Sequence, residues 1–189
     1  MKKLKLTGEE TLFKTPRMKA VKVTYSDEDG NCVLTHTIIR SNPSVAIIVR
    51  KNGQIALIKQ FRSTTGQNYI EIPAGVINDG ESESEAAVRE TREETGLLVK
   101  GAYSLVKGPS LLDPSKSDEN YGVAVAEVYG QKAQCLDEME QIDSEILWMD
   151  EKEVFARVRA QMFKGEPFMD DLFMSGHSLY ALMAYMMSK

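Results

Sequence analysis

The pattern of apolar and polar residues predicts strands over most of the first half of the chain. Residues 20–25 alternate, and residues 32–39 continue after a polar turn with many β-branched side chains. Residues 44–49 form a nearly continuous apolar run, which is typical of a buried strand, and 54–60 supply its partner after a tight turn. A shorter strand is expected at 69–73. This half therefore predicts an N-terminal β-hairpin followed by a central sheet.

The strongest helix prediction covers residues 82–95. Ser82 and Glu85 have the three-residue spacing of a capping box, in which each side chain bonds the other residue's backbone N–H. Gly96 follows where a helix would end, because glycine readily adopts the left-handed conformation of a C-cap. Both ends of this helix are therefore specified by local chemistry.

Three further strands and two further helices complete the prediction. The strands are expected at 97–106, 121–128 and 145–149, and the helices at 150–163 and 175–188. Polar segments separate them, including a long acidic loop before residue 145. Asp150 and Glu153 have the spacing of a second capping box. Strands interspersed with helices predict the α/β (α+β) class with a mixed sheet.

Length, charge and cysteine content narrow the class of protein. A chain of 189 residues, 42% hydrophobic and 27% charged, suits one globular domain at 43–189 with an extension at 1–42. The net charge of −5 argues against a nucleic-acid partner. No apolar leader and no 18-residue apolar run is present, so we expect neither secretion nor membrane insertion. Cys32 and Cys135 lack disulfide or zinc spacing, so a cytoplasmic protein is expected.

Candidate chemistry lies on the helix at 82–95. Glu90, Glu93 and Glu94 fall within roughly 100° of its circumference, so their carboxylates repel one another and favour a cation. Oxygen ligands of this kind suit Mg²⁺, or Mn²⁺ as the alternative, better than zinc. Arg89 precedes them and can hold a carboxylate with its planar guanidinium. Taken alone, however, such a cluster is more often a solvated helix face.

The acidic cluster belongs to a longer pattern. Its fixed positions are Gly75, Glu81, Arg89, Glu90, Glu93, Glu94 and Gly96. Seven fixed types, at background frequencies of about 7% each, would coincide about once in 10⁸ positions. They match the Nudix box, G-x5-E-x7-R-E-U-x-E-E-x-G-U, at every charged and glycine position, so the chain resembles a Nudix hydrolase. Thr91 stands where a bulky aliphatic residue is usual, and we expect it to face the sheet.

Two segments before the box extend the resemblance to one branch of the family. Lys59-Gln60-Phe61-Arg62, followed after eight residues by Glu71-Ile72-Pro73-Ala74-Gly75, is similar to the ADP-ribose and ADP-sugar pyrophosphatases. The resemblance implies an α/β/α sandwich with an N-terminal β-hairpin extension. It also implies a nucleoside diphosphate sugar as substrate, and a homodimer in which the extension contacts the second subunit.

The resemblance assigns roles to individual residues. Metal ligands are expected to be the Ala74 carbonyl with Glu90, Glu93 and Glu94, and Glu93 and Arg89 are also placed in the catalytic set. Substrate contacts are expected from Arg40, Arg62, Val76 and Asp113. The general base is expected to be Glu145, with Glu138 and Glu140 as rivals. Arg40 could equally end a surface strand, and Asp113 could equally form a turn.

The expected reaction is Mg²⁺-dependent hydrolysis of ADP-ribose, or of a related sugar nucleotide, to a nucleoside monophosphate and a sugar phosphate. GDP-mannose, NADH and diadenosine polyphosphates are rival substrates. A sensor that binds a nucleotide sugar without cleaving it belongs to a different class of function. The intact box favours the enzyme.

Overall fold

The structure is a computed structural model that describes residues 3–16, 18–107, 110–131 and 146–189. Within these limits the chain forms two compact units. The first contains the described residues up to 43 together with 110–121. The second contains 44–107 and the described residues from 122 onward.

The first unit is built on a three-stranded antiparallel sheet. Its strands are β1 (Lys5–Lys14), β2 (Met18–Ser26) and β3 (Cys32–Ser41), and they lie in the order β1-β2-β3. The β2–β3 hairpin was expected, but β1 is an additional strand. Asp27 closes the hairpin turn, because its Oδ1 accepts from the backbone N–H groups of Asp29 and Asn31.

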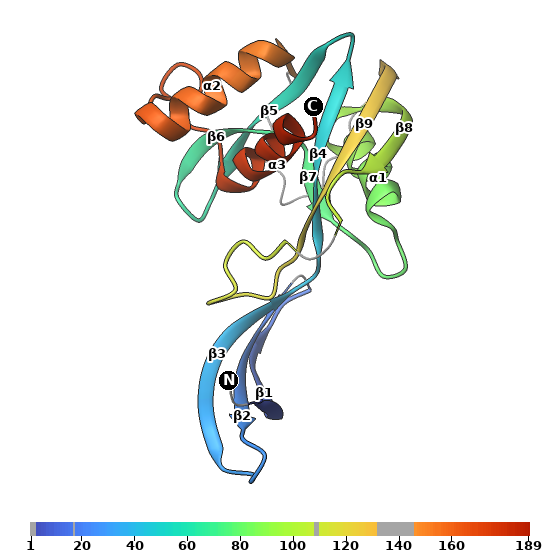
Figure 1. Ribbon diagram of the computed structural model, residues 1–189. Helices are drawn as coiled ribbons and strands as arrows, with labels where there is room; N and C mark the ends of the chain where they lie inside the picture. Colours follow the sequence, from blue (N-terminus) through green and yellow to red (C-terminus); the bar gives the residue numbers. More distant parts are fainter. Residues whose placement is uncertain (1–2, 17, 108–109, 132–145) are drawn as a thin grey trace. The chain divides into compact units, whose positions relative to one another are not determined.

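The second unit contains a seven-stranded sheet (Figure 1). Its strands are β4 (Ser44–Lys51), β5 (Gln54–Arg62), β6 (Gln67–Glu71), β7 (Ala74–Val76), β8 (Leu97–Ser104), β9 (Tyr121–Gln131) and β10 (Leu147–Asp150). The order is β10-β5-β4-β9-β8, with β6 paired to β5 and β7 paired to β4. β4 and β9 run in the same direction in Figure 1, whereas β5 pairs antiparallel with β4 and β10. The sheet is therefore mixed, as predicted.

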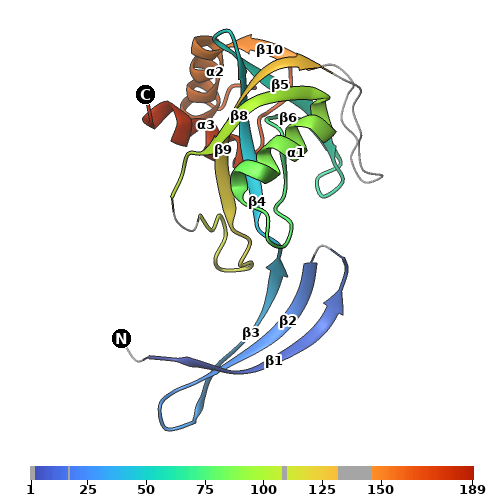
Figure 2. The same ribbon diagram turned by 90° about the vertical axis from the view of Figure 1, so that its right-hand side faces the viewer.

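Helices cover both faces of this sheet (Figures 1 and 2). They are α1 (Glu83–Thr95), α2 (Glu151–Lys164) and α3 (Gly176–Met187). Alternate residues of β4 point to the two faces of the sheet, because successive side chains of a strand point in opposite directions. Val45, Ile47 and Val49 pack in the cluster that includes α1. Ala46 and Ile48 pack in the cluster that includes α2 and α3. The expected α/β/α sandwich is confirmed.

The helix ends test the local predictions. Ser82 and Glu85 form the capping box of α1, and Gly96 ends the helix in the left-handed conformation with φ of 69°. The second predicted capping box is wrong. Asp150 caps α2 by accepting from the backbone N–H of Lys152, while Glu153 instead pairs with Arg157 one helical turn later.

Candidate active site

The acidic side chains of α1 lie against the short strand β7. In the pairing of β7 with β4, Gly75 lies opposite Val45. A Cβ atom on Gly75 would lie 1.9 Å from Cδ of Glu90, far inside van der Waals contact. Glycine is therefore required here because the Glu90 carboxylate occupies the space of a side chain.

The same strand contacts a second carboxylate. The backbone N–H of Ala74 donates to Oε2 of Glu94 at 3.1 Å. Glu90 and Glu94 are both buried, whereas the side chain of Glu93 is 30% exposed. Two of the three carboxylates predicted to bind the metal, those of Glu90 and Glu94, are thus buried. They lie next to Ala74, whose carbonyl was expected to be a further ligand.

Arg89 connects the acidic residues to one another. Its Nε and Nη2 donate to the two carboxylate oxygens of Glu81 at 2.9 and 2.8 Å. Its Nη1 donates to Glu90 at 2.6 Å and to Glu93 at 3.0 Å. Its Nη2 also donates to the Val76 carbonyl at 2.8 Å. Arg89 therefore holds carboxylates in this structure, while its catalytic role and the substrate contact expected of Val76 stay predictions.

The electrostatics of this cluster favour an added cation. Hydrogen bonds from Arg89 hold the pKa of Glu81 below its ordinary value, and the Glu81 carboxylate raises the pKa of Arg89. One guanidinium cannot neutralise Glu81, Glu90 and Glu93 together, and Glu94 adds a further buried carboxylate. Hard oxygen donors and an excess of negative charge fit Mg²⁺ or Mn²⁺. Within the described residues, no three His, Cys, Asp or Glu side chains are grouped so that they could hold a metal ion as they stand.

Arg62 lies at the end of β5 and is bound to a buried acid. Its Nε donates to Oε1 of Glu71 at 2.9 Å, and its Nη2 donates to Oε2. The Glu71 side chain has no exposed surface, whereas that of Arg62 is 37% exposed. His177, at the start of α3, places Nε2 3.5 Å from the same Oε2. The sequence pattern indicated Arg62, but it gave no signal for His177, which is 106 residues beyond Glu71.

Arg40 and Asp113 belong to the first unit. Arg40 donates from Nη1 to Asp118 at 2.9 Å and from Nη2 to Glu9 at 2.9 Å. Asp113 accepts from the Ser115 hydroxyl, and this bond is the main cause of its lowered pKa. Both arrangements agree with the structural alternatives weighed from the sequence, a strand end and a turn. Their substrate contacts stay predictions.

The predicted general base cannot be placed. Glu145 and its rivals Glu138 and Glu140 lie outside the described residues. The role of each stays a prediction.

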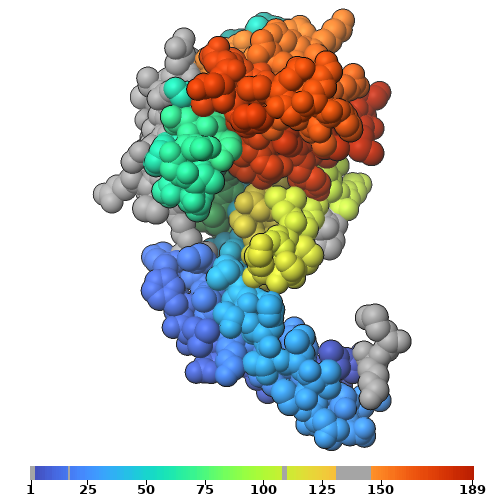
Figure 3. Space-filling view, turned by 90° about the vertical axis from the view of Figure 1, so that its left-hand side faces the viewer, coloured from blue at the N-terminus to red at the C-terminus, as the bar shows by residue number. Residues whose placement is uncertain are grey.

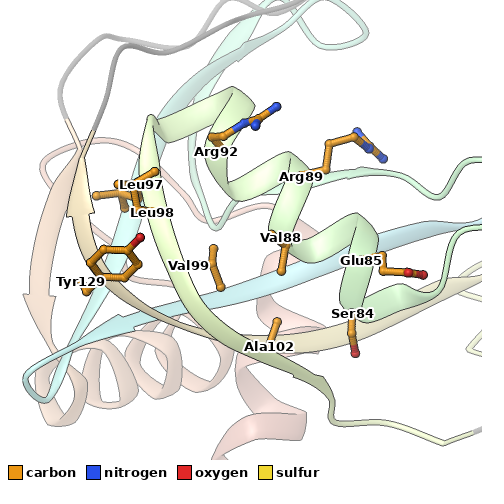
Figure 4. Close-up of a pocket in the computed structure, with 10 residues that line it drawn as sticks. All are labelled: Ser84, Glu85, Val88, Arg89, Arg92, Leu97, Leu98, Val99, Ala102 and Tyr129. Carbon is orange, nitrogen blue, oxygen red and sulfur yellow. The ribbon is translucent and has the colours of Figure 1, made fainter.

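A hollow beside α1 includes Arg89 in its lining, so it borders the acidic cluster (Figure 4). It is lined by Val88, Arg92, Leu97, Val99 and Tyr129 among others. Glu90, Glu93 and Glu94 are not among its lining residues, and Figure 4 shows the Arg89 guanidinium directed away from the apolar floor.

Comparison with known protein families matches residues 40–172 to the NUDIX domain. This match covers more than half of the chain and includes the whole β7–α1 site. The protein belongs to the Nudix family. Members of this family generally use divalent metal ions, which agrees with the donor chemistry of Glu90, Glu93 and Glu94.

Several curated Nudix proteins are similar in sequence. A putative nudix hydrolase 2 of Caenorhabditis elegans is 34% identical over 132 residues, which are 66% of this chain and 59% of the relative. A mouse ADP-sugar pyrophosphatase is 32% identical over 139 residues, 68% of this chain and 63% of the relative. An ADP-ribose pyrophosphatase of Bacillus subtilis is 31% identical over 109 residues, 57% of this chain and 56% of the relative. The matched region thus spans about six tenths of the length of these relatives.

The Nudix fold is also found among solved structures. A crystal structure described as an ADP compounds hydrolase superposes with a TM-score of 0.73, covering 100% of this chain and 95% of that chain at 20% identity. At this identity the likeness establishes the fold alone. None of the described helices is both long enough and apolar enough to span a membrane.

Proposed function

We propose that this Nudix protein hydrolyses the diphosphate bond of ADP-ribose, or of a related nucleoside diphosphate sugar, in a reaction that depends on Mg²⁺. The observation that carries the proposal is the placement of Glu90 and Glu94 against Ala74 and Gly75 of β7, with Arg89 holding Glu90 and Glu93. Relatives named ADP-sugar pyrophosphatase and ADP-ribose pyrophosphatase support the choice of substrate class.

The acidic face would hold the metal through Glu90, Glu93, Glu94 and the Ala74 carbonyl. When bound, Mg²⁺ supplies charge neutralisation at the diphosphate and acidifies the attacking water. Arg89 keeps two of the carboxylates oriented before a cation arrives, so less ordering is needed on binding.

The remaining roles follow from the chemistry of each side chain. Arg62 has a planar set of N–H donors that suits phosphate oxygens, and part of its side chain is exposed. Arg40, Val76 and Asp113 are proposed to contact the rest of the substrate. Glu145 is proposed to remove the proton from the attacking water, with Glu138 and Glu140 as the alternatives.

The test is release of AMP from ADP-ribose by purified protein, with Mg²⁺ and with EDTA. We expect turnover that requires the metal. Glu94→Gln should lower turnover by at least about 100-fold, because it removes a charged group that would hold the metal in the transition state. Glu85→Gln is the matched control: it makes the same change in the same helix, outside the acidic cluster, and glutamine still completes a capping box. No AMP at any enzyme concentration would reject the proposal.

The rival substrates are separated by the same assay. ADP-ribose, GDP-mannose, NADH and diadenosine polyphosphates are compared by kcat/KM, and a preference for one of the last three would reassign the substrate within the family. A sensor would bind ADP-ribose in calorimetry and release no product, and Glu94→Gln would have no turnover to lower.

We also propose a homodimer in the cytoplasm. The sheet of the first unit exposes apolar side chains, namely Leu6, Leu12, Phe13, Val33 and Leu34. Exposed apolar side chains gathered on one small sheet commonly mark an interface, and a second copy is the partner implied by the resemblance. A monomeric mass in light scattering would reject the dimer. Cys32 and Cys135 have no disulfide spacing in the sequence, which favours a reducing compartment.

A further inference from the structure

Glu71 is a buried carboxylate whose surroundings are built to keep it charged. Its side chain has no exposed surface, and it lies at the end of β6, three residues before Ala74. A charged group in such a place costs several kcal/mol unless it is paired and hydrogen-bonded. Arg62 provides the pairing through two parallel N–H bonds, one from Nε and one from Nη2.

This pairing determines the direction of the Arg62 side chain. The guanidinium is planar, so fixing Nε and Nη2 on one carboxylate fixes the position of the whole group, Nη1 included. The orientation of Arg62 therefore depends on the orientation of Glu71. Whatever holds the Glu71 carboxylate also holds the phosphate-binding group proposed for this enzyme.

The beginning of α3 and the segment before it pack beside β6, the strand that ends at Glu71. The segment before α3 runs along β6: the backbone N–H of Ile70 donates to the Phe173 carbonyl at 3.0 Å, and Ile70 pairs with Met174. The backbone N–H of Ile72 donates to the Ser178 hydroxyl at 3.2 Å. Figure 3 shows the surface of the turn after β5 next to that of the segment leading into α3.

His177 is the residue of this segment that reaches Glu71. Its Nε2 lies 3.5 Å from Oε2, the oxygen that also accepts from Arg62. Only 14% of the His177 side chain is exposed, and burial lowers its pKa. Its Nδ1 lies 3.3 Å from the Ser175 hydroxyl. The Nε2–Oε2 contact is longer than an ordinary hydrogen bond, so it acts through electrostatics. When the Ser175 hydroxyl donates to Nδ1, the hydrogen of the neutral imidazole is on Nε2, and the N–H dipole turns its positive end toward the carboxylate.

We propose that His177 is a positioning residue for substrate binding: it fixes the Glu71 carboxylate, which in turn holds the Arg62 guanidinium in the orientation that binds the diphosphate of the substrate. This inference rests on the proposed hydrolysis of a nucleoside diphosphate sugar. Its influence is placed in Glu71 and Arg62, because Nε2 of His177 lies 3.5 Å from the carboxylate oxygen that Arg62 also binds.

The inference predicts a change in KM without a matching change in kcat. His177→Phe keeps a ring in place and removes the N–H dipole. We expect KM for ADP-ribose to rise about 3- to 10-fold, the value of one modest polar interaction, with kcat within about 2-fold. His177→Gln restores KM, because its amide N–H can reach the carboxylate. If phenylalanine does not fit, His177→Leu takes its place.

The decisive measurement is a double-mutant cycle with Glu71→Gln, which removes the carboxylate that links the two residues. In that background His177→Phe should change KM by less than about 2-fold, the usual error of additivity. Leu182→Ala, a buried change in the same helix, controls for destabilisation: it should lower Tm and leave KM unchanged in folded protein.

The outcomes separate the two proposals. Wild-type protein that cleaves none of the diphosphates tested overturns both. Active wild-type protein in which His177→Phe leaves KM unchanged, or changes it equally with and without Glu71→Gln, overturns the role of His177 alone. A KM effect that Gln does not restore points to packing and also overturns it.

Discussion

Thr91→Val tests whether the departure from the family pattern at this position carries a cost in stability. Thr91 is fully buried in α1, and its hydroxyl has no hydrogen-bond partner within the described residues. Valine has nearly the same shape and similar helix propensity, so the change removes a buried polar group and leaves the packing in place. Stability should therefore rise.

The burial of Thr91 sets the size of the expected change in stability, and Thr95 provides a matched control. An unsatisfied buried hydroxyl costs about 1–2 kcal/mol, so Thr91→Val should raise Tm by about 2–6 °C in a chain of this size. Thr95, one turn later and equally buried, donates to the Thr91 carbonyl and accepts from the Leu97 N–H at 3.2 Å. Thr95→Val removes both bonds and should lower stability by about 1–2 kcal/mol.

The assay is thermal and urea unfolding of wild type and both variants at the same protein concentration, with and without Mg²⁺. Opposite signs for the two substitutions are expected, because they differ only in what the hydroxyl bonds. A loss of stability in Thr91→Val comparable to that in Thr95→Val would refute the reasoning, since it would mean that the Thr91 hydroxyl is satisfied in solution.

Two further substitutions test other parts of the structure. Gly75→Ala should lower kcat/KM by at least about 100-fold, because the new Cβ would displace the Glu90 carboxylate by more than an ångström; Gly101→Ala, whose Cβ meets nothing within 4 Å, is the control and should leave kcat/KM unchanged. Arg40→Gln should raise the pKa of Glu9 toward its ordinary value of 4.5 in an NMR titration, because the Arg40 hydrogen bond is the main cause of its lowering. The stabilisation from Glu9 is present above pH 4.5 and is lost as pH falls through the lowered pKa. A pKa of Glu9 that stays the same in Arg40→Gln would contradict the ion pair.

Features that depend on neighbouring residues were predictable from the sequence. The Ser82 cap and the Gly96 stop involve residues within one turn of the helix, so their chemistry is visible in the spacing. The apolar run at 44–49 predicted a buried strand, and β4 lies between two helical layers. The acidic face of α1 was predicted because a helix brings residues three and four positions apart together.

Features that depend on distant residues were not predictable in this way. β1 has little apolar periodicity because almost all of its residues are exposed, so its pattern does not distinguish it from a loop. His177 meets Glu71 only because α3 packs beside β6, and Arg40 meets partners 31 and 78 residues away. Asp150 caps α2 as the local rule predicts, but Glu153 accepts from Arg157 and does not complete the capping box.

The two-sided packing of β4 has a consequence for how β7 is held in place. Sliding this strand by one residue would send every side chain to the wrong layer, so the hydrophobic interior fixes its alignment. Gly75 is paired directly to that strand. The position of Gly75, against which the Glu90 carboxylate lies, is therefore fixed by apolar packing on both faces of the sheet. Side chains remote from the proposed metal ligands thus determine where that carboxylate can lie.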